Sequence, residues 1–334
     1  MQESSNILTD SFGRHHSYLR ISLTEKCNLR CTYCMPENGV VLSPKKQLMT
    51  TQEVMDIAQL FVKNGVTKIR LTGGEPLLRK DFPEIITALS KLPVHLSLTT
   101  NAILVDRHIE TFKKSNLKAI NVSLDTLIPA KFNTITKRDQ FNKAYDNIKL
   151  LLNHNFNVKL NVVLIKGFND DEIIDFINFT KNEHITVRFI EFMPFDGNNW
   201  DTCKIVSYKD ILDKVEEYYL PSNVTMLTNE KNFTARNFKI KGFTGTFGII
   251  STVTNPFCDS CNRIRLTANG KLKNCLFSTT ETDLLTPFRE NQQIEPIIQA
   301  AIQKKKAVRS GMTSINDFKN LTNHDNRSMI TIGG

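Results

Sequence analysis

The segment Cys27-Asn-Leu-Arg-Cys-Thr-Tyr-Cys34 determines how the rest of this chain is interpreted. Its three cysteines have the spacing CxxxCxxC, and the next cysteine along the chain is Cys203. A structural zinc site usually closes with four ligands, whereas an iron-sulfur cubane held by three thiolates keeps one iron open to a further ligand. The spacing therefore favours a cluster with an open coordination position, and half of a split zinc site is the alternative.

A second group of three cysteines lies near the C-terminus, at Cys258, Cys261 and Cys275. Its pattern is CxxC, thirteen residues and one more cysteine, whereas a zinc ribbon would require a second pair. We expect the remaining Cys203 to be a buried thiol without a ligand role. Two sites of three ligands each predict two clusters, each with a vacant iron.

The composition indicates an ordinary globular protein of the reducing cytosol. The 334 residues are 40% hydrophobic and 23% charged, with neither an apolar run of about 18 residues nor a secretory leader. Seven cysteines in such a compartment are more typical of metal binding than of disulfides. The net charge of +9 favours an anionic partner such as a nucleotide or a nucleic acid, and a lysine-rich solvated surface is the alternative.

Short apolar runs and longer helical patterns alternate along the first part of the chain. The predicted strands cover 18–23, 67–72, 95–99, 118–124, 158–164 and 186–192, and the predicted helices lie near 50–65, 82–91, 104–115, 139–154 and 170–182. Thr50 and Glu53 form a capping box for the first helix, and Gly65 ends it. Alternating strands and helices predict parallel pairing. Six units fall short of a closed barrel, so we expect an α/β fold of the incomplete (βα)6 TIM-like type, with its chemistry at the carboxyl ends of the strands.

The pattern changes after Phe192. One helix is predicted at 207–219 and another near 284–303, with short alternating runs between them. We therefore assign residues 1–220 to the partial barrel with the first cluster. Residues 221–334 form an α+β extension that carries the second cluster and packs against the open side of the barrel.

Two segments resemble the radical S-adenosylmethionine (SAM) enzymes. CxxxCxxC, with the aromatic Tyr33 before its last cysteine, has the spacing of those enzymes, and Thr72-Gly-Gly-Glu-Pro76 after the second strand resembles their GGEP segment. In that superfamily the open iron chelates the amino and carboxylate groups of SAM, and the GGEP backbone pairs with the methionyl amino group. Glycine permits such a close approach.

A third segment narrows the resemblance. Arg263 and Arg265 stand two apart, so on a strand they point the same way and suit phosphate capture, although a solvated strand face is the alternative. Both cysteine patterns, this RxRxT segment and the terminal Gly333-Gly334 closely resemble the GTP 3′,8-cyclase family of molybdenum cofactor biosynthesis over nearly the whole chain.

This resemblance implies two [4Fe-4S] clusters, one for each cysteine trio, together with SAM and GTP. It implies SAM contacts at Tyr33, Gly73, Gly74, Glu75, Ser123 and Met193. It implies GTP contacts at Arg20, Arg70, Thr99, Lys159, Arg188, Arg263, Arg265, Gly333 and Gly334. Arg263 and Arg265 would also be catalytic, and the terminal glycines would insert into the active site, with a frayed terminus as the alternative.

The implied activity is that of a radical lyase. One-electron cleavage of SAM would give a 5′-deoxyadenosyl radical that takes hydrogen from C3′ of GTP, after which C3′ attacks C8 of the guanine. The implied partners are an external one-electron reductant and, downstream, cyclic pyranopterin monophosphate synthase. A homodimer is allowed, and neither nucleic acid nor a membrane is expected.

Two departures and two rival functions remain open at this point. Ala102 stands where glycine is expected after Thr-Thr-Asn, and Asn269 where aspartate is frequent. One rival is a radical enzyme for another nucleotide or a peptide. The other is a zinc-bearing nucleic-acid-binding module, which the lack of regularly spaced aromatic residues on a basic strand does not favour.

Overall fold

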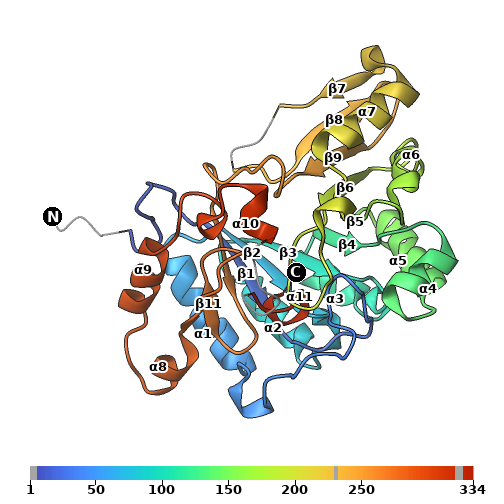
Figure 1. Ribbon diagram of the computed structural model, residues 1–334. Coiled ribbons are helices and arrows are strands. Elements are labelled where there is room, and N and C mark those ends of the chain that lie inside the picture. The colour runs from blue at the N-terminus through green and yellow to red at the C-terminus, as the bar shows by residue number, and fades with distance from the viewer. Residues whose placement is uncertain (1–5, 229–231, 320–325, 334) are drawn as a thin grey trace.

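The computed structural model describes residues 6–228, 232–319 and 326–333. Six parallel strands follow one another in space in chain order, as predicted (Figure 1). They are β1 (Tyr18–Ser22), β2 (Lys68–Thr72), β3 (His95–Thr100), β4 (Ala119–Ser123), β5 (Asn157–Leu164) and β6 (Ile185–Glu191). The incomplete barrel expected from the alternating pattern is confirmed.

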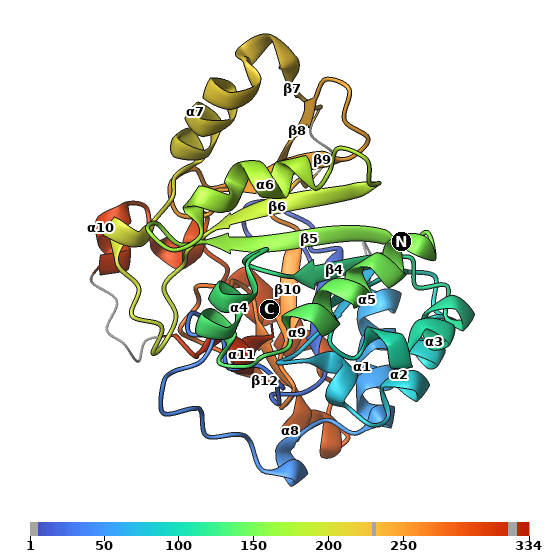
Figure 2. The same ribbon diagram turned by 90° about the vertical axis from the view of Figure 1, so that its right-hand side faces the viewer.

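Helices connect these strands and cover the outer side of the sheet (Figure 2). They are α1 (Thr51–Lys63), α2 (Phe82–Leu89), α3 (Ile109–Lys114), α4 (Pro129–Thr136), α5 (Phe141–Asn153) and α6 (Ile173–Asn178). The capping box of α1 is present, since Glu53 N–H donates to Thr50 Oγ1 at 3.2 Å and Thr50 N–H donates to Glu53 Oε2 at 2.7 Å. Helix α4 was not predicted, and Pro129 at its first position fits a helix start.

The extension adds strands to both sides of the barrel sheet instead of forming a separate layer. The added strands are β7 (Val224–Met226), β8 (Arg236–Ile240), β9 (Thr246–Ile250), β10 (Arg263–Leu266), β11 (Lys271–Lys273) and β12 (Thr282–Asp283). Strand β10 pairs in parallel with β1, and β9 pairs in parallel with β6. One 12-stranded sheet results, with the order β12-β11-β10-β1-β2-β3-β4-β5-β6-β9-β8-β7.

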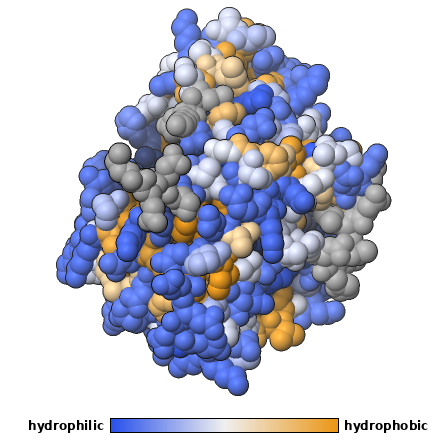
Figure 3. All heavy atoms as spheres, turned by 90° about the vertical axis from the view of Figure 1, so that its left-hand side faces the viewer, coloured by the Kyte–Doolittle hydropathy of each residue, from blue (hydrophilic) through white to orange (hydrophobic). Residues whose placement is uncertain are grey.

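The remaining helices are α7 (Tyr208–Tyr219), α8 (Leu285–Arg289), α9 (Glu295–Gln303), α10 (Ile315–Lys319) and α11 (Met329–Ile332). The single helix predicted near 284–303 is wrong, because the chain breaks between α8 and α9, where Asn291 has a left-handed φ of 58°. A helix cannot continue through that conformation. None of the described helices is both long and apolar enough to span a membrane, and hydrophilic residues cover most of the face shown in Figure 3.

The strands have one apolar face and one polar face, which positions the site. In β5, the apolar Val158, Leu160, Val162 and Leu164 are fully buried in the main hydrophobic core. Asn161 and Val163, which alternate with them, line a cavity inside the barrel. Because successive strand residues point to opposite faces, the same alternation turns Arg20 and Arg70 inward.

Candidate active site

One cavity inside the barrel brings together most of the predicted site residues. Its volume is about 310 Å³. The predicted residues on its wall are Arg20, Cys27, Cys31, Tyr33, Cys34, Arg70, Gly73, Gly74, Thr99, Ser123, Arg188, Met193, Cys258, Cys261, Arg263, Arg265 and Cys275. Both cysteine trios therefore face a common space, although more than 200 residues separate them in the sequence.

The first trio lies in the loop that leaves the carboxyl end of β1. Cys27, Cys31 and Cys34 are half-buried free thiols, and a turn with Cys34 N–H donating to Cys31 O at 3.0 Å brings the last two together. Burial, with Glu75 adding to it, raises the pKa of Cys27 to about 11. Burial, with Asp125 adding to it, raises the pKa of Cys31 well above its usual range. A bound metal centre would stabilise the thiolate forms that burial disfavours here.

The Gly-Gly-Glu segment after β2 packs directly against this cysteine loop. Gly74 N–H donates to Thr24 O at 2.7 Å, and Glu75 N–H donates to Lys26 O at 2.8 Å. A Cβ atom on Gly74 would lie 2.4 Å from Lys26 O. Glycine is therefore required at this position by the approach of the protein's own loop, a reason that the sequence alone did not reveal.

The Glu75 side chain is fully buried at the end of β3. Its carboxylate accepts hydrogen bonds from Thr100 Oγ1 and Asn101 N–H, each at 2.8 Å, and burial raises its pKa to about 7. Asn101 Nδ2 in turn lies 3.9 Å from Cys27 Sγ. Glu75 thus positions the residue beside the first cysteine.

Tyr33, Ser123 and Met193 converge on the side of the cavity near the first trio. The side chain of Tyr33 hydrogen-bonds to Asp125, whose pKa burial raises to about 6. Asn198 Nδ2 donates to Met193 O at 2.8 Å and to Tyr33 O at 3.2 Å. This one amide fixes the cysteine loop against the loop that follows β6.

The second trio lines the same cavity as the first and has different surroundings. Cys258 and Cys261 lie between β9 and β10, and Cys275 follows β11. Burial raises the pKa of Cys258. Burial acts in the same direction on Cys261, but the Lys305 and Arg263 cations outweigh it and lower the pKa of that thiol to about 6.

Arginines from neighbouring strands form a row on the wall of the same cavity. Arg20 pairs in register with Arg265 of β10 and with Arg70 of β2, and Arg188 and Arg263 also line the cavity. Burial, together with Arg70 and Arg263, lowers the pKa of Arg20 to about 10. Burial lowers the pKa of Arg265 well below its usual range.

Tyr18 lies on the same inward face of β1 as Arg20. The guanidinium carbons of Arg20 and Arg70 each lie 5.4 Å from the centre of its ring. Burial would raise the pKa of Tyr18, but Arg70, Arg20 and Lys68 outweigh burial and lower it to about 8. The lowered pKa of Tyr18 reflects the concentration of positive charge inside the barrel.

Two buried polar atoms on this wall indicate that a ligand is needed. Arg20 Nε and Thr99 Oγ1 are buried without a hydrogen-bond partner among the described residues. Such atoms are costly unless something binds them. Because like charges in one cavity repel each other, the residues present fit a polyanion.

Two other predicted substrate residues do not line this cavity. Lys159 is half-buried on β5, at the register position beside Asn121. Gly333 lies over the ends of β1 and β2, where a Cβ atom would be 2.7 Å from Thr72 Oγ1. Arg265 Nη1 donates a hydrogen bond to Gly333 O, and Gly334 lies outside the described residues.

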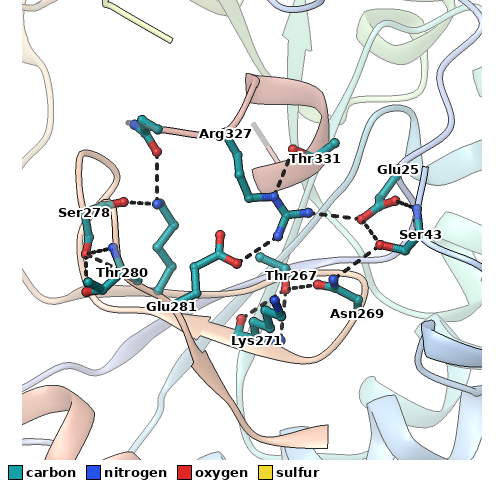
Figure 4. A network of polar contacts seen from close by, with 12 residues as sticks. Glu25, Ser43, Thr267, Asn269, Lys271, Ser278, Thr280, Glu281, Arg327 and Thr331 are labelled. Carbon is teal, nitrogen blue, oxygen red and sulfur yellow. Dashed lines mark hydrogen bonds and ion pairs between the residues drawn. The ribbon is translucent and has the colours of Figure 1, made fainter. Parts of the chain in front are cut away.

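A polar network holds this C-terminal segment in place (Figure 4). Arg327 donates to Glu25 Oε1 at 3.2 Å, to Glu281 Oε2 at 2.9 Å and to Thr331 Oγ1 at 3.2 Å. Glu25 belongs to the loop that carries the first trio, and Glu281 belongs to the extension. The segment is therefore attached to both halves of the molecule.

Three loop positions can be compared with the sequence-based expectations. Cys203 is exposed in a short turn, so the prediction of a buried thiol is wrong. Its N–H donates to Asp201 Oδ1 at 2.8 Å, which fixes the turn at the surface. Ala102 has a left-handed φ of 67°, which explains why glycine is expected there. Asn269 Nδ2 donates to Ser43 Oγ at 3.3 Å, a bond that aspartate could not donate.

Sequence reasoning missed several residues that shape the site. Asn101, Asp125 and Arg309 all line the cavity, and Arg309 is a buried cation that donates to Val253 O at 2.6 Å. Asn101 directly follows β3, and Asp125 lies two residues after the end of β4. Site residues of such barrels gather at the carboxyl ends of the strands, so these positions could have identified both residues. Nothing in the local sequence of Arg309 indicates burial.

The cysteines fit iron-sulfur clusters by their donor chemistry, because each trio supplies three thiols to the wall of one cavity. Within the ranges that the structure describes, no three His, Cys, Asp or Glu side chains are grouped to hold a single metal ion.

Comparison with families of known proteins gives two matches. Residues 21–180 match the family described as the Radical SAM superfamily. Residues 185–310 match the family described as Molybdenum Cofactor Synthesis C. The first match contains the CxxxCxxC trio, and the second contains all of the second trio.

Individual relatives extend these matches. The human protein named molybdenum cofactor biosynthesis protein 1 is 48% identical over 322 residues, which are 95% of this chain and 50% of that protein. The chain thus spans about half of that relative's length. The Arabidopsis thaliana protein named GTP 3′,8-cyclase, mitochondrial, is 46% identical over 99% of this chain and 84% of its own length.

Among solved structures, SuiB of Streptococcus suis bound to S-adenosylmethionine has a similar fold. Its TM-score is 0.59 at 16% identity, covering 94% of this chain and 77% of that one. At this identity the likeness supports the fold alone.

Proposed function

Since this chain belongs to the GTP 3′,8-cyclase family of the radical SAM superfamily, we propose that it cyclises GTP to (8S)-3′,8-cyclo-7,8-dihydroguanosine 5′-triphosphate. This reaction is the first step of molybdenum cofactor biosynthesis and makes the protein a SAM-dependent radical lyase. The observation that carries the proposal is the shared cavity, whose wall carries both cysteine trios and a row of arginines.

The family's cofactors are two [4Fe-4S] clusters and SAM. We assign one cluster to Cys27, Cys31 and Cys34, and the other to Cys258, Cys261 and Cys275. When bound, these cofactors supply the one-electron chemistry that removes hydrogen from the ribose.

SAM would be bound on the side of the cavity that carries the first cysteine trio. This part of the wall is formed by Tyr33, Ser123 and Met193. Gly73 and Gly74 also line it, and because glycine has no side chain their peptide groups are accessible to a ligand. Glu75 contributes its backbone to this segment and its carboxylate to the position of Asn101.

The arginine row would hold the triphosphate. Arg20, Arg70 and Arg265 lie side by side on adjacent strands, and the further contacts assigned to GTP are Thr99, Lys159, Arg188, Arg263, Gly333 and Gly334. Guanidinium groups suit bidentate phosphate binding. Holding the phosphates at one end and the base at the second trio would restrict the nucleotide, as ring closure requires.

Arg263 and Arg265 would be catalytic because they connect the two anchors. Arg265 lies within the row, and Arg263 is beside the second trio, with its Nη1 donating to Thr234 Oγ1 at 2.9 Å. A guanidinium at this place can stabilise negative charge where base and ribose meet.

The proposal extends to partners and location. An external one-electron reductant would reduce the first cluster, and cyclic pyranopterin monophosphate synthase would take the product. A homodimer is allowed. We place the protein in the cytosol, whose reducing conditions keep cysteine ligands free; the Arabidopsis relative is named as mitochondrial.

The test is anaerobic reconstitution with reductant, SAM and GTP, followed by detection of cyclised nucleotide and 5′-deoxyadenosine. Wild-type protein should form both products. Cys258→Ser should still form some 5′-deoxyadenosine while losing the cyclised nucleotide. Cys203→Ser, which changes an exposed cysteine, is the matched control and should behave as wild type.

Two results would contradict the proposal. Normal cyclisation by Cys258→Ser would remove the second trio from the mechanism. SAM cleavage by wild type without any change in GTP would favour a radical enzyme that acts on another nucleotide or a peptide.

A further inference from the structure

One lysine in a run of three has a different environment from its neighbours. Lys304, Lys305 and Lys306 follow α9, and Lys304 and Lys306 are exposed, as is usual for lysine. Lys305 is only 4% exposed. A buried lysine requires compensating acceptors, because taking an ammonium group out of water is costly.

Both acceptors of Lys305 belong to the second trio or to its edge. The ammonium Nζ donates to Cys261 Sγ at 3.5 Å and to Arg263 O at 2.9 Å. A nitrogen-to-sulfur distance of this size is a normal hydrogen bond, since sulfur is larger than oxygen. The lysine thus joins the sulfur of one ligand to the first residue of β10.

A second set of contacts fixes the backbone that carries this lysine. Arg14 donates to Cys258 O at 3.0 Å, to Lys306 O at 2.9 Å and to Ala307 O at 2.7 Å. Asp10 holds the Arg14 Nε at 2.7 Å. The N-terminal segment therefore braces the turn after α9 against the Cys258–Cys261 loop, and the position of Lys305 does not depend on its own side chain alone.

The charge around the second trio supports a specific role for this contact. Hydrogen bonds to cluster sulfurs and nearby positive charge raise the reduction potential of an iron-sulfur cluster. The lowered pKa of Cys261 has the same physical origin. For the first trio, the neighbouring charges are the carboxyl groups of Glu75 and Asp125.

We propose that Lys305 is a positioning residue that donates a charge-assisted hydrogen bond to the Cys261 sulfur of the second cluster, raising its reduction potential and stabilising its retention. The inference rests on the proposed function, which assigns a cluster to this trio. It goes further because it assigns a difference in reduction potential between the two clusters to one side chain that is not a cluster ligand.

The test uses the full chain with Cys27, Cys31 and Cys34 all changed to Ser, so that only the second cluster is observed. In this background, Lys305→Met is compared with Lys306→Met, which removes an exposed charge one residue away. The readouts are iron and sulfide content and the midpoint of an anaerobic redox titration followed by electron paramagnetic resonance. Lys305→Gln keeps a neutral donor and carries the same test if Lys305→Met does not fold.

We expect Lys305→Met to shift the midpoint to a more negative potential and to lose cluster on gel filtration. Lys305→Gln should shift it less, and Lys306→Met should match the background. An unchanged midpoint in both Lys305→Met and Lys305→Gln would overturn this inference and leave the proposed function intact. A background protein that binds no cluster at the second trio would contradict the proposed function and with it this inference.

Discussion

The two cysteine trios line the same cavity, but the protein surrounds them with opposite charge. Burial raises the pKa of the thiols Cys27 and Cys31 in the first trio, and the nearby carboxyl groups of Glu75 and Asp125 add to this effect. Cations of Lys305 and Arg263 lie near the second and lower the pKa of Cys261 to about 6.

This difference suits a division of work between the trios. Negative charge near a cluster favours its oxidised form and makes the reduced form a stronger donor, whereas positive charge and hydrogen bonds to sulfur have the opposite effect. The first trio is therefore suited to donate an electron. The second is suited to hold a substrate that carries negative charge.

The largest effect is expected from Arg20, in the middle of the arginine row on the cavity wall. Arg20→Ala should weaken GTP binding by about 100-fold, because a buried charge-assisted contact is worth about 1.5–3 kcal/mol. Isothermal titration calorimetry measures the dissociation constant for GTP and, in parallel, for guanosine. Guanosine lacks the phosphates, so its binding should change little. Without GTP the variant should not unfold at a lower temperature, since one of several repelling buried cations has been removed.

The exposed Arg138→Ala is the control for this variant and should bind GTP as wild type does. Equal losses for GTP and guanosine in Arg20→Ala would show that Arg20 does not act through the phosphates.

Acid should weaken the side of the molecule that braces the second trio. His16 is fully buried with its Nε2 3.1 Å from Asp10 Oδ2, and burial, followed by Lys305, lowers its pKa from 6.5 to about 3. In the unfolded chain His16 takes up a proton below about pH 6.5, whereas in the folded chain it does so only near pH 3. The contribution of neutral His16 to the free energy of unfolding is therefore complete above pH 6.5 and is lost as the pH falls toward 3. The slope contributed is at most about 1.4 kcal/mol per pH unit.

Denaturant unfolding of His16→Gln across this pH range measures the effect. The variant should lose stability less steeply than wild type, while the exposed His95→Gln should follow wild type. Parallel curves for wild type and His16→Gln would mean that His16 does not contribute.

The link between the two halves should have a moderate effect. Arg327→Ala should lower the free energy of unfolding by about 1–3 kcal/mol, because it leaves the Glu25 carboxylate, whose side chain is 2% exposed, without its cation (Figure 4). In a double-mutant cycle with Glu25→Gln, the two losses should add up to more than the loss in the double variant. Additive losses would contradict a direct coupling.

The smallest effect is expected in the loop beside the first trio. Ala102→Gly should raise the free energy of unfolding by about 0.5 kcal/mol, because glycine adopts the left-handed φ of 67° without strain. Ala58→Gly, the same change at a buried position inside α1, should lower it by about 1 kcal/mol. Chemical denaturation distinguishes the two, and the same sign for both would contradict the role of backbone conformation.

The local sequence was sufficient for the six strands of the partial barrel. The strand–helix alternation between Tyr18 and Glu191 is a local pattern, and it predicted six of the twelve strands with boundaries close to those observed. Strand periodicity likewise predicted that Arg263 and Arg265 point the same way, and the structure adds that this direction is into the cavity.

Features that depend on distant partners could not be predicted. Strand β10 pairs with β1 across more than 200 residues, and no local pattern specifies that pairing. Lys305 is indistinguishable in sequence from the exposed lysines beside it. The glycine requirement at Gly74 comes from Lys26 in another loop. Tertiary packing decides each of these features.

In the proposed function, each cysteine trio holds its own iron-sulfur cubane in one cavity. The most direct test of this assignment is iron, sulfide and zinc analysis with Mössbauer spectroscopy of protein purified without oxygen, together with Cys31→Ser and Cys258→Ser. We predict about eight irons per wild-type chain, all in [4Fe-4S] clusters, and a reduced content in each variant. A wild-type protein with a single cluster, or with zinc at either trio, would contradict this assignment.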